Sequence, residues 1–210
     1  MVVEAPRPSS RRKRAAILEA AETVFLRDGF VGASVDEVVA VSGVSKQTIY
    51  NHFGSKERLF VAVVSARTTA AGDAVHPDEH GLPGPDELAG YLEKYLFRQA
   101  TVVLRPRILR LRRLVIGEVE RFPDLARTLW EDGPARAISA LAVLVSQLDA
   151  AGLVRAPDAR AAASSLNWLV MSGPLNEAML LGDGAVPDEE ALRRHTREAV
   201  RIFLTAYAPT

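Results

Sequence analysis

Residues 34–60 read SVDEVVAVSGVSKQTIYNHFGSKERLF, and within them two short helical patterns are joined by Ser42-Gly43-Val44. A third helix pattern starts just beyond the second. A short helix, a turn that contains glycine and a second short helix form a helix-turn-helix motif, whose second helix enters the major groove of DNA. This stretch therefore predicts a nucleic-acid partner more clearly than any other part of the chain.

The ends of these helices carry the expected capping residues. Ser34 can cap the first helix, where Asp36 and Glu37 place negative charge at the positive end of the helix dipole. Gly43 supplies the left-handed backbone conformation that a tight turn between helices needs. Ser45 can cap the second helix. The expected core contacts of that second helix are Val44, Ile49 and Phe53.

The remaining side chains of the second helix are polar and are predicted to face outward: Lys46, Gln47, Thr48, Tyr50, Asn51 and His52. Amide side chains can bond adenine edges, lysine suits guanine, and hydroxyl groups can bond phosphate. Lys56 stands in the first turn of the next helix, where a positive charge is unfavourable unless it faces a phosphate. The alternative is an ordinary three-helix surface with solvated polar residues.

The preceding segment, residues 14–28 (RAAILEAAETVFLRD), is predicted to be a helix with Ile17, Ala21 and Phe25 along one stripe, ended by Gly29-Phe30. The motifs ILEAAETVFLRDGF, SVDEVVAVSGVS and TIYNHFGSKERLF together closely resemble the DNA-binding domain of the tetracycline-repressor (TetR) family. The resemblance covers about residues 13–64 and includes the order of the motifs, their spacing and the residues that begin and end the helices.

This resemblance implies which residues contact DNA. Gln47, Asn51 and Lys46 match positions that contact bases in the family, whereas Tyr50, His52, Lys56, Thr48 and the Ser34 cap match positions that hold phosphates. The predicted DNA-binding residues are therefore Ser34, Ser45, Lys46, Gln47, Thr48, Tyr50, Asn51, His52 and Lys56. The function implied is a sequence-specific transcriptional regulator, a ligand-relieved repressor that binds a palindromic operator as a homodimer.

The overall composition fits a DNA-binding unit joined to a larger helical domain. The 210 residues are 48% hydrophobic and 25% charged, with zero net charge. Residues 1–72 carry ten Lys/Arg and seven Asp/Glu, whereas the remainder carries sixteen and nineteen. A modestly basic DNA-binding unit joined to a modestly acidic helical domain suits sequence-specific binding better than non-specific binding of nucleic acid. The absence of cysteine excludes disulfides and thiolate metal sites, and no apolar run is long enough to span a membrane, so we expect a cytoplasmic protein.

Beyond residue 72 there is no strand-like alternation, and proline followed by an acid repeatedly marks helix starts. The predicted helices lie near 55–71, 85–103, 106–121, 123–131, 134–151, 157–181 and 187–207. The predicted fold is all-α with about ten helices. We expect a disordered basic tail (1–12), a helix-turn-helix domain (13–72) and a helical effector-binding and dimerisation domain (85–207). Residues from Arg112 to Ala137 look like the C-terminal domain of one subgroup of the family.

The last two helices are predicted to form the homodimer interface, because the resemblance places a four-helix interface there. A DNA-binding dimer with two-fold symmetry also requires an operator with two-fold symmetry. The alternative is that their apolar stripes pack within their own domain. The stripe of the last helix comprises Leu192, Thr196, Ala199, Val200, Phe203, Leu204 and Tyr207, and the helix before it begins with the small residues 161–165.

An effector pocket is predicted around the Gly173-Pro174 break, where proline frees the carbonyl group near Val170. Its candidate lining residues are Tyr95, Phe97, Trp130, Asn167, Trp168, Met171 and Asn176, for each of which ordinary core packing is the alternative. The basic cluster of Arg105, Arg107, Arg110, Arg112 and Arg113 binds an anionic effector, forms a solvated face or contacts the DNA-binding unit. The sequence does not fix the chemistry of the effector.

Two rival functions leave weaker signals. For an enzyme there is no phosphate-binding glycine loop and no Gly-x-Ser-x-Gly motif, and we predict no catalytic residue, metal or cofactor. Residues 76–80 (HPDEH) offer two imidazoles and two carboxylates, but proline and the loop setting favour no metal site. A non-specific architectural DNA-binding protein is the second rival, and the neutral overall charge argues against it.

Overall fold

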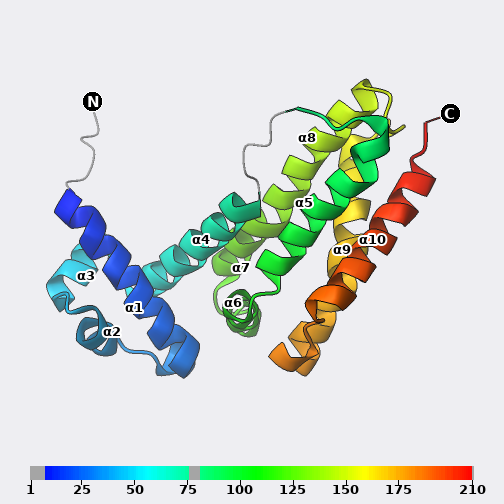
Figure 1. The fold of residues 1–210 in the computed structure, drawn as a ribbon. Coiled ribbons are helices and arrows are strands. Elements are labelled where there is room, and N and C mark those ends of the chain that lie inside the picture. Colours follow the sequence, from blue (N-terminus) through cyan, green and yellow to red (C-terminus); the bar gives the residue numbers. More distant parts are fainter. Residues whose placement is uncertain (1–7, 76–80, 210) are drawn as a thin grey trace, which may run out of the picture. The chain divides into compact units, whose positions relative to one another are not determined.

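The computed structural model describes residues 8–75 and 81–209, and all the regular secondary structure of these residues is helical (Figure 1). The α-helices of the described chain are α1 (Pro8–Gly32), α2 (Val35–Ser42), α3 (Lys46–Phe53), α4 (Lys56–Val75), α5 (Leu88–Val103), α6 (Pro106–Gly117), α7 (Pro123–Trp130), α8 (Arg136–Ala150), α9 (Ala159–Leu181) and α10 (Glu189–Ala206). A π-helical turn, Glu131–Ala135, joins α7 to α8. The predicted all-α fold is confirmed.

The first helix differs from its prediction at both ends. Residues 8–12, predicted to belong to a disordered tail, form the first turns of α1, which starts at a proline as many helices do. Residues 1–7 lie outside the described residues. At the other end, α1 resumes after Gly29 and reaches Gly32. Gly29 adopts φ 71° and ψ 174°, so it kinks the helix rather than ending it.

Packing contacts divide the chain into two units. The first unit comprises residues up to Arg67 together with Arg110–Leu129, and the second comprises Thr68–Leu109 together with the chain from Trp130 onward. The chain therefore passes between the units within α4, within α6 and at the end of α7. Residues 110–129, which the sequence predicts to belong to the C-terminal domain, pack in the first unit.

Aromatic rings form the core of the first unit. Phe25, Phe30 and Phe60 are almost fully buried, with ring centroids 4.8–6.0 Å apart. Phe122, which precedes α7, meets Phe30 edge-on at 4.6 Å. Residues 110–129 add further buried side chains to the same cluster: Leu111, Val115 and Leu125. A short three-helix domain buries little surface by itself, so these residues complete its core.

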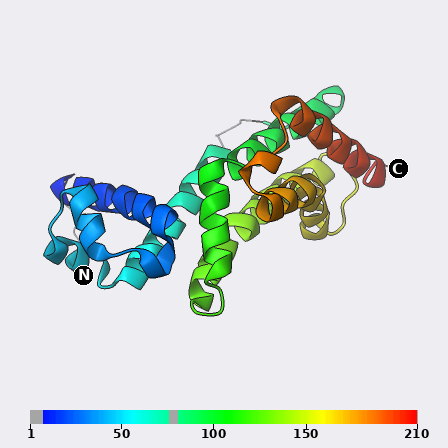
Figure 2. The same ribbon diagram turned by 90° about the horizontal axis from the view of Figure 1, so that it is seen from below.

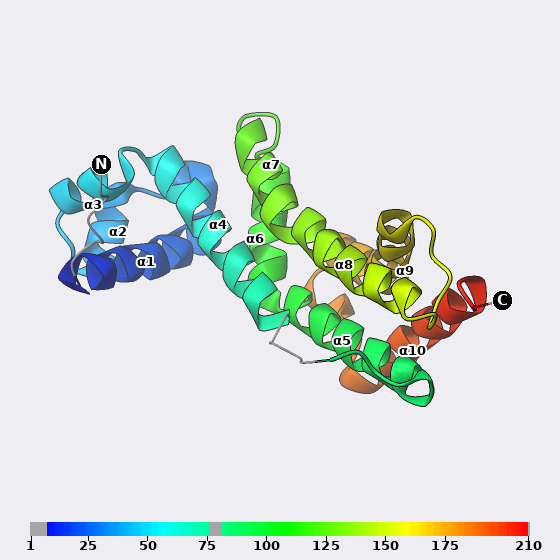
Figure 3. The ribbon, with the colours of Figure 1, turned by 90° about the horizontal axis from the view of Figure 1, so that it is seen from above.

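The second unit is a helical bundle in which α8 packs on α9, and α10 packs on α5 and α9 (Figures 2 and 3). The apolar stripe predicted for the last helix is largely buried in this bundle: Leu192, Thr196, Ala199, Val200 and Phe203 are each at most 4% exposed. That stripe therefore stabilises its own unit. Among the described residues, no helix combines the length and the apolar character needed to cross a membrane.

Candidate nucleic-acid interface

The capping interactions predicted for α2 and α3 are present. The hydroxyl oxygen of Ser34 accepts a hydrogen bond from the Glu37 backbone N–H at 3.2 Å, and the Glu37 carboxylate accepts one from the Ser34 backbone N–H at 3.2 Å. This reciprocal pair is a capping box. Gly43 has φ 65° and donates its N–H to Val39 O at 3.0 Å, which closes α2. The Ser45 hydroxyl accepts the Thr48 N–H at 3.3 Å and starts α3.

These caps leave α3 with one buried face and one outward face. Ile49 and Phe53 are 1% and 7% exposed, and the half-buried Val44 packs against the same core, as predicted. The Arg14 guanidinium lies 5.5 Å from the centroid of the Phe53 ring. The side chains on the opposite face are exposed at Ser45, Lys46, Gln47, Tyr50 and Asn51 and half-buried at Thr48 and His52.

The outward face of α3 is ordered by contacts among its own polar groups and with α2. Gln47 Nε2 donates to Asn51 Oδ1 at 2.9 Å, a spacing of one helical turn. That bond uses one atom of each amide, so each side chain keeps a second polar atom for a base edge. Lys46 Nζ lies 2.8 Å from Asp36 Oδ1 on α2. The hydrogen bond and the charge of Asp36 raise the pKa of Lys46.

Lys56 has a structural role that the sequence does not reveal. Its ammonium group donates to Ala33 O at 2.8 Å and to Val31 O at 3.4 Å, and it lies 4.6 Å from the centroid of the Phe30 ring. The lysine therefore fixes the connection between α1 and α2, although it lies more than twenty residues further along the chain. No local pattern predicts a contact of that separation. Its role as a phosphate contact stays a prediction.

A buried ion pair was also missed by the sequence analysis. The Glu22 carboxylate on α1 is 1% exposed and pairs with the Arg67 guanidinium, which α4 supplies within the first unit. In the sequence Glu22 reads as an ordinary charged residue beside the apolar stripe of α1. Its partner lies 45 residues away, so helical periodicity contains no signal for the pair.

The predicted effector residues separate into three groups in the second unit. Tyr95, Asn167 and Met171 are buried in its core, and Phe97 and Trp168 are half-buried against that core. Trp130 and Asn176 are exposed, contrary to an enclosed pocket. Trp130 stands where α7 gives way to the π-helical turn, and Asn176 faces outward because neighbouring residues occupy the buried face of α9.

Two polar features predicted beside the pocket are already bonded within the chain. Asn167 Oδ1 accepts a hydrogen bond from Gln99 Nε2 of α5 at 2.8 Å, and Gln99 Oε1 is buried without a partner. Pro174 lacks the N–H that Val170 O would accept, as predicted. A ring nitrogen of His195 lies 2.9 Å from that carbonyl oxygen and must donate to it. His195 of α10 is therefore half-buried and occupies the freed carbonyl group.

The signal for a metal site falls on residues that the structure does not describe. Residues 76–80, which contain both histidines and both carboxylates of the HPDEH segment, lie outside the described residues. Within residues 8–75 and 81–209, no group of three His, Asp or Glu side chains is arranged to hold a metal ion.

Two family models match the chain. Residues 17–63 match the model for bacterial regulatory proteins of the tetR family, and residues 90–209 match the C-terminal domain of AefR-like transcriptional repressors. An HTH-type transcriptional repressor of Streptomyces coelicolor is 33% identical over 98 residues, which cover 47% of this chain and 46% of the relative. The repressor AcnR of Corynebacterium efficiens is 42% identical over 69 residues, or 33% of this chain and 36% of the relative. The chain thus spans less than half the length of these curated relatives.

Solved structures match over almost the whole chain. A TetR-family transcriptional regulator from Mesorhizobium loti superposes with a TM-score of 0.84 and 31% identity, covering 96% of this chain and 99% of that one. The flavonoid-responsive regulator FrrA has a TM-score of 0.72 and 31% identity, covering 95% and 98%. The helix-turn-helix geometry, the two matching family models and the nearly complete structural match establish that this chain belongs to the TetR family of bacterial transcriptional regulators.

Proposed function

We propose that this regulator is a repressor that binds a palindromic operator as a homodimer and releases it when a small molecule binds. The observation that supports DNA reading most strongly is the outward face of α3. Two amides, one lysine and one tyrosine project from a helix whose other face is anchored by Ile49 and Phe53. Such a helix presents base-reading and phosphate-binding groups together without loss of core packing.

The proposed homodimer uses the last two helices through faces that their own unit leaves open. The buried stripe of α10 is occupied by the second unit, so it does not take part. On α9, Ala161, Ser165 and Ser172 are exposed small residues that permit close helix approach. Leu180 is 75% exposed on the same helix and Ile202 is 39% exposed on α10. These apolar side chains would be buried in the dimer.

Ligand release rests on the course of the chain and on one relative. The flavonoid-responsive regulator FrrA, at 31% identity, is named for its response to a small molecule. Helices α4 and α6 each belong partly to both units, so a change in the second unit can be transmitted along them. Two recognition helices must stay about one DNA turn apart to fit their half-sites. A coupling of about 1–3 kcal/mol is typical and changes operator occupancy several-fold or more.

The test is selection of bound duplexes from a random library, followed by footprinting and titration of the selected site. We expect an inverted repeat protected over two half-sites, with one protein dimer bound. Selected and scrambled duplexes are then compared across salt concentrations. A repressor of this kind favours the selected site at every salt concentration, by about 10³-fold or more. Equal affinities for both duplexes would instead indicate the non-specific architectural protein.

Repression itself is tested separately with a reporter gene placed behind the selected site. Expression of the protein should lower reporter output, and a Gln47→Ala/Asn51→Ala variant should restore it. Higher output with the unaltered protein would contradict the repressor assignment, while leaving operator recognition intact.

A further inference from the structure

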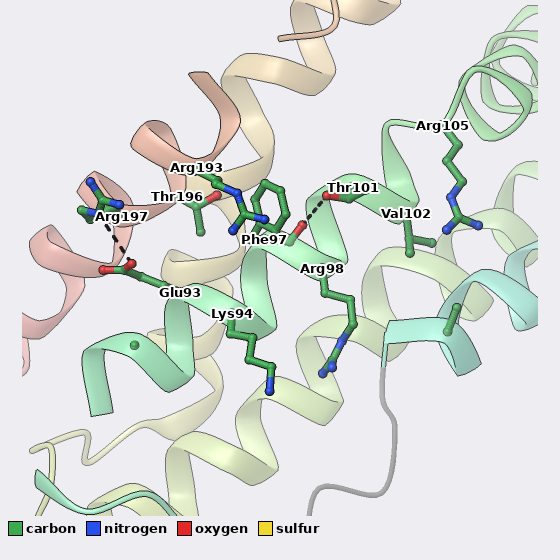
Figure 4. Close-up of a pocket in the computed structure, with 12 residues that line it drawn as sticks. Glu93, Lys94, Phe97, Arg98, Thr101, Val102, Arg105, Arg193, Thr196 and Arg197 are labelled. Carbon is green, nitrogen blue, oxygen red and sulfur yellow. Dashed lines mark hydrogen bonds and ion pairs between the residues drawn. The ribbon is translucent and has the colours of Figure 1, made fainter. Parts of the chain in front are cut away.

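A groove between α5 and α10 in the second unit has the size of a small-molecule site. It is an open groove with a volume of about 550 Å³, lined mainly by one face of α5 and one face of α10 (Figure 4). Ligand pockets in proteins commonly have volumes of about 300–1,000 Å³. We call it the α5–α10 groove. Of the seven side chains that the sequence predicts around an effector, it contains only Phe97.

The rim of the α5–α10 groove is strongly basic. Five of its twelve lining residues are cationic and only one, Glu93, is acidic. The cationic residues are Lys94, Arg98, Arg105, Arg193 and Arg197. Glu93 lies 3.6 Å from Arg197, and the nearby Glu189 accepts two hydrogen bonds from Arg193. Arg105, Arg193 and Arg197 alone outnumber these two carboxylates, in a chain with zero net charge. A concave surface lined by one sign of charge attracts the opposite charge.

The walls of the α5–α10 groove are apolar between these charges. The Arg193 guanidinium lies over the Phe97 ring, 3.9 Å from its centroid, and Figure 4 shows the two groups next to one another. Val102, which is buried, also lines the groove. The hydroxyl groups of Thr101 and Thr196 donate to backbone carbonyl groups of their own helices, so they are already bonded. The groove therefore combines an apolar, partly planar wall with cationic groups at its rim.

We propose that the α5–α10 groove binds an organic anion with an aromatic body. The ring stacks on the guanidinium that covers Phe97, and the carboxylate or phosphate group takes charge-assisted hydrogen bonds from the arginines of α10. Sulfate-sized ions alone leave most of the apolar wall uncovered. The groove thus selects for an apolar body as well as for negative charge.

The position of the groove connects it to the chain segments that enter the first unit. Ala74 lines it from the last turn of α4, and Arg105 lines it immediately before α6 begins at Pro106. An anion that draws Arg105 toward α10 acts on the residue that immediately precedes α6. A ligand shifts an equilibrium only through contacts that differ between the two states, and Arg105 supplies such a contact. The bound anion is therefore the effector, an identification that rests on the proposed function.

The binding test uses calorimetry with 1-naphthoate, phenyl phosphate, inorganic phosphate and neutral 1-naphthalenemethanol on the full chain. We expect one aromatic anion per chain, with the neutral alcohol and inorganic phosphate at least about tenfold weaker. The relative strength of 1-naphthoate and phenyl phosphate distinguishes a carboxylate from a phosphate ligand. Absence of binding by both aromatic anions at millimolar concentration would overturn the proposal.

Variants locate the site. Arg193→Gln/Arg197→Gln should weaken the aromatic anion at least about tenfold. Arg201→Gln removes an exposed arginine of the same helix that pairs with Glu198 and lies outside the groove lining. It should leave the affinity unchanged. Equal losses in both variants would show that the anion responds to the general charge of α10, and would contradict the groove.

The effector role is measured separately from binding. Operator affinity is titrated with and without saturating 1-naphthoate in the unaltered protein and in Arg193→Gln/Arg197→Gln. Weaker operator binding in the unaltered protein alone supports the effector role. If calorimetry locates the anion in the groove and operator affinity does not change, the site stands and the effector role fails. If the protein binds no operator, the proposed function fails while calorimetry still decides the site.

Discussion

The same pair of amide side chains occurs twice in this chain, in opposite surroundings. On α3, Gln47 Nε2 donates to Asn51 Oδ1 at 2.9 Å, and both side chains are exposed. Between α5 and α9, Gln99 Nε2 donates to Asn167 Oδ1 at 2.8 Å, and both residues are 3% exposed. The bonds are nearly identical in length, so the difference between the two sites lies in access to water and to other partners.

Burial decides what each pair can do. Water can replace either partner of the exposed pair, so breaking that bond costs little and DNA can compete for it. The buried pair is shielded from bulk solvent, and Gln99 Oε1 has no hydrogen-bond partner within the chain. Loss of Asn167 would leave the remaining amide wholly unpaired. We therefore expect the buried pair to govern stability and the exposed pair to govern recognition.

The largest expected effect is that of Asn167→Ala. It leaves the Gln99 amide buried without its partner and opens a small cavity, so we expect the free energy of unfolding to fall by about 2–4 kcal/mol. Urea denaturation followed by circular dichroism measures this change. Operator affinity of the folded fraction should be unaltered, because Asn167 belongs to the second unit, whereas α3 belongs to the first.

The matched control removes both amides. Gln99→Met/Asn167→Leu replaces the pair with apolar side chains of similar size, and it should recover most of the lost stability, because neither partner is then left unsatisfied. A double variant as unstable as Asn167→Ala would show that the lost stability comes from packing rather than from the unpaired amide. The proposed difference in stability between the buried and the exposed amide pair would then be wrong.

The exposed pair could be predicted from the sequence, and the buried pair could not. Ser45 before an eight-residue helix, with Ile49 and Phe53 on one face, determines which side chains of α3 point outward. These relations are local in the sequence, so the helical period of 3.6 residues is enough to predict which side chains point outward. Gln99 and Asn167 are 68 residues apart, and only the packing of α5 on α9 brings them together.

The same limit explains the other differences from the sequence analysis. The contact of His195 with the Val170 carbonyl group joins two helices, so the local sequence around His195 does not predict it. The basic residues of the α5–α10 groove come from three separate segments, and the sequence groups Arg105 with its neighbours on α6 instead. Helix ends and caps follow from local chemistry, whereas sites assembled from several helices require the tertiary structure.

The second prediction concerns the exposed pair. Gln47→Ala should change the free energy of unfolding by less than about 0.5 kcal/mol, since an exposed hydrogen bond is replaced by water. It should reduce discrimination at one base pair of the operator by about 1–3 kcal/mol. Competition titrations with operators that carry each single base change measure this loss, and the affinity for the other positions should be retained.

The matched control is Tyr50→Phe on the same exposed face. It removes one hydroxyl group that is predicted to bond phosphate, so binding to every duplex should weaken by a similar amount, about 0.5–1.5 kcal/mol. Its base preference should be unchanged. Identical discrimination profiles for Gln47→Ala and Tyr50→Phe would mean that the division of α3 into base and phosphate contacts is wrong.

The smallest effect expected is that of Asp36→Asn, which acts on the lysine beside the exposed amides. Asp36 holds Lys46 at 2.8 Å, and both side chains are mostly exposed. Without the carboxylate the pKa of Lys46 falls back toward its ordinary value, which is still far above neutral pH. The ammonium group therefore stays charged, and it is free to contact DNA. Operator affinity should rise about two- to fivefold, within the range of an exposed ion pair.

Two controls decide whether this gain acts through Lys46. Glu57→Gln removes an acid from the first turn of α4, a matched loss of favourable helix-dipole charge, and it should leave operator affinity unchanged. In a Lys46→Gln background, Asp36→Asn should have no further effect on operator affinity. A gain in operator affinity that persists without Lys46 would mean that Asp36 repels DNA directly. The ion pair between Asp36 and Lys46 would then not control how readily α3 exchanges its internal contacts for contacts with DNA.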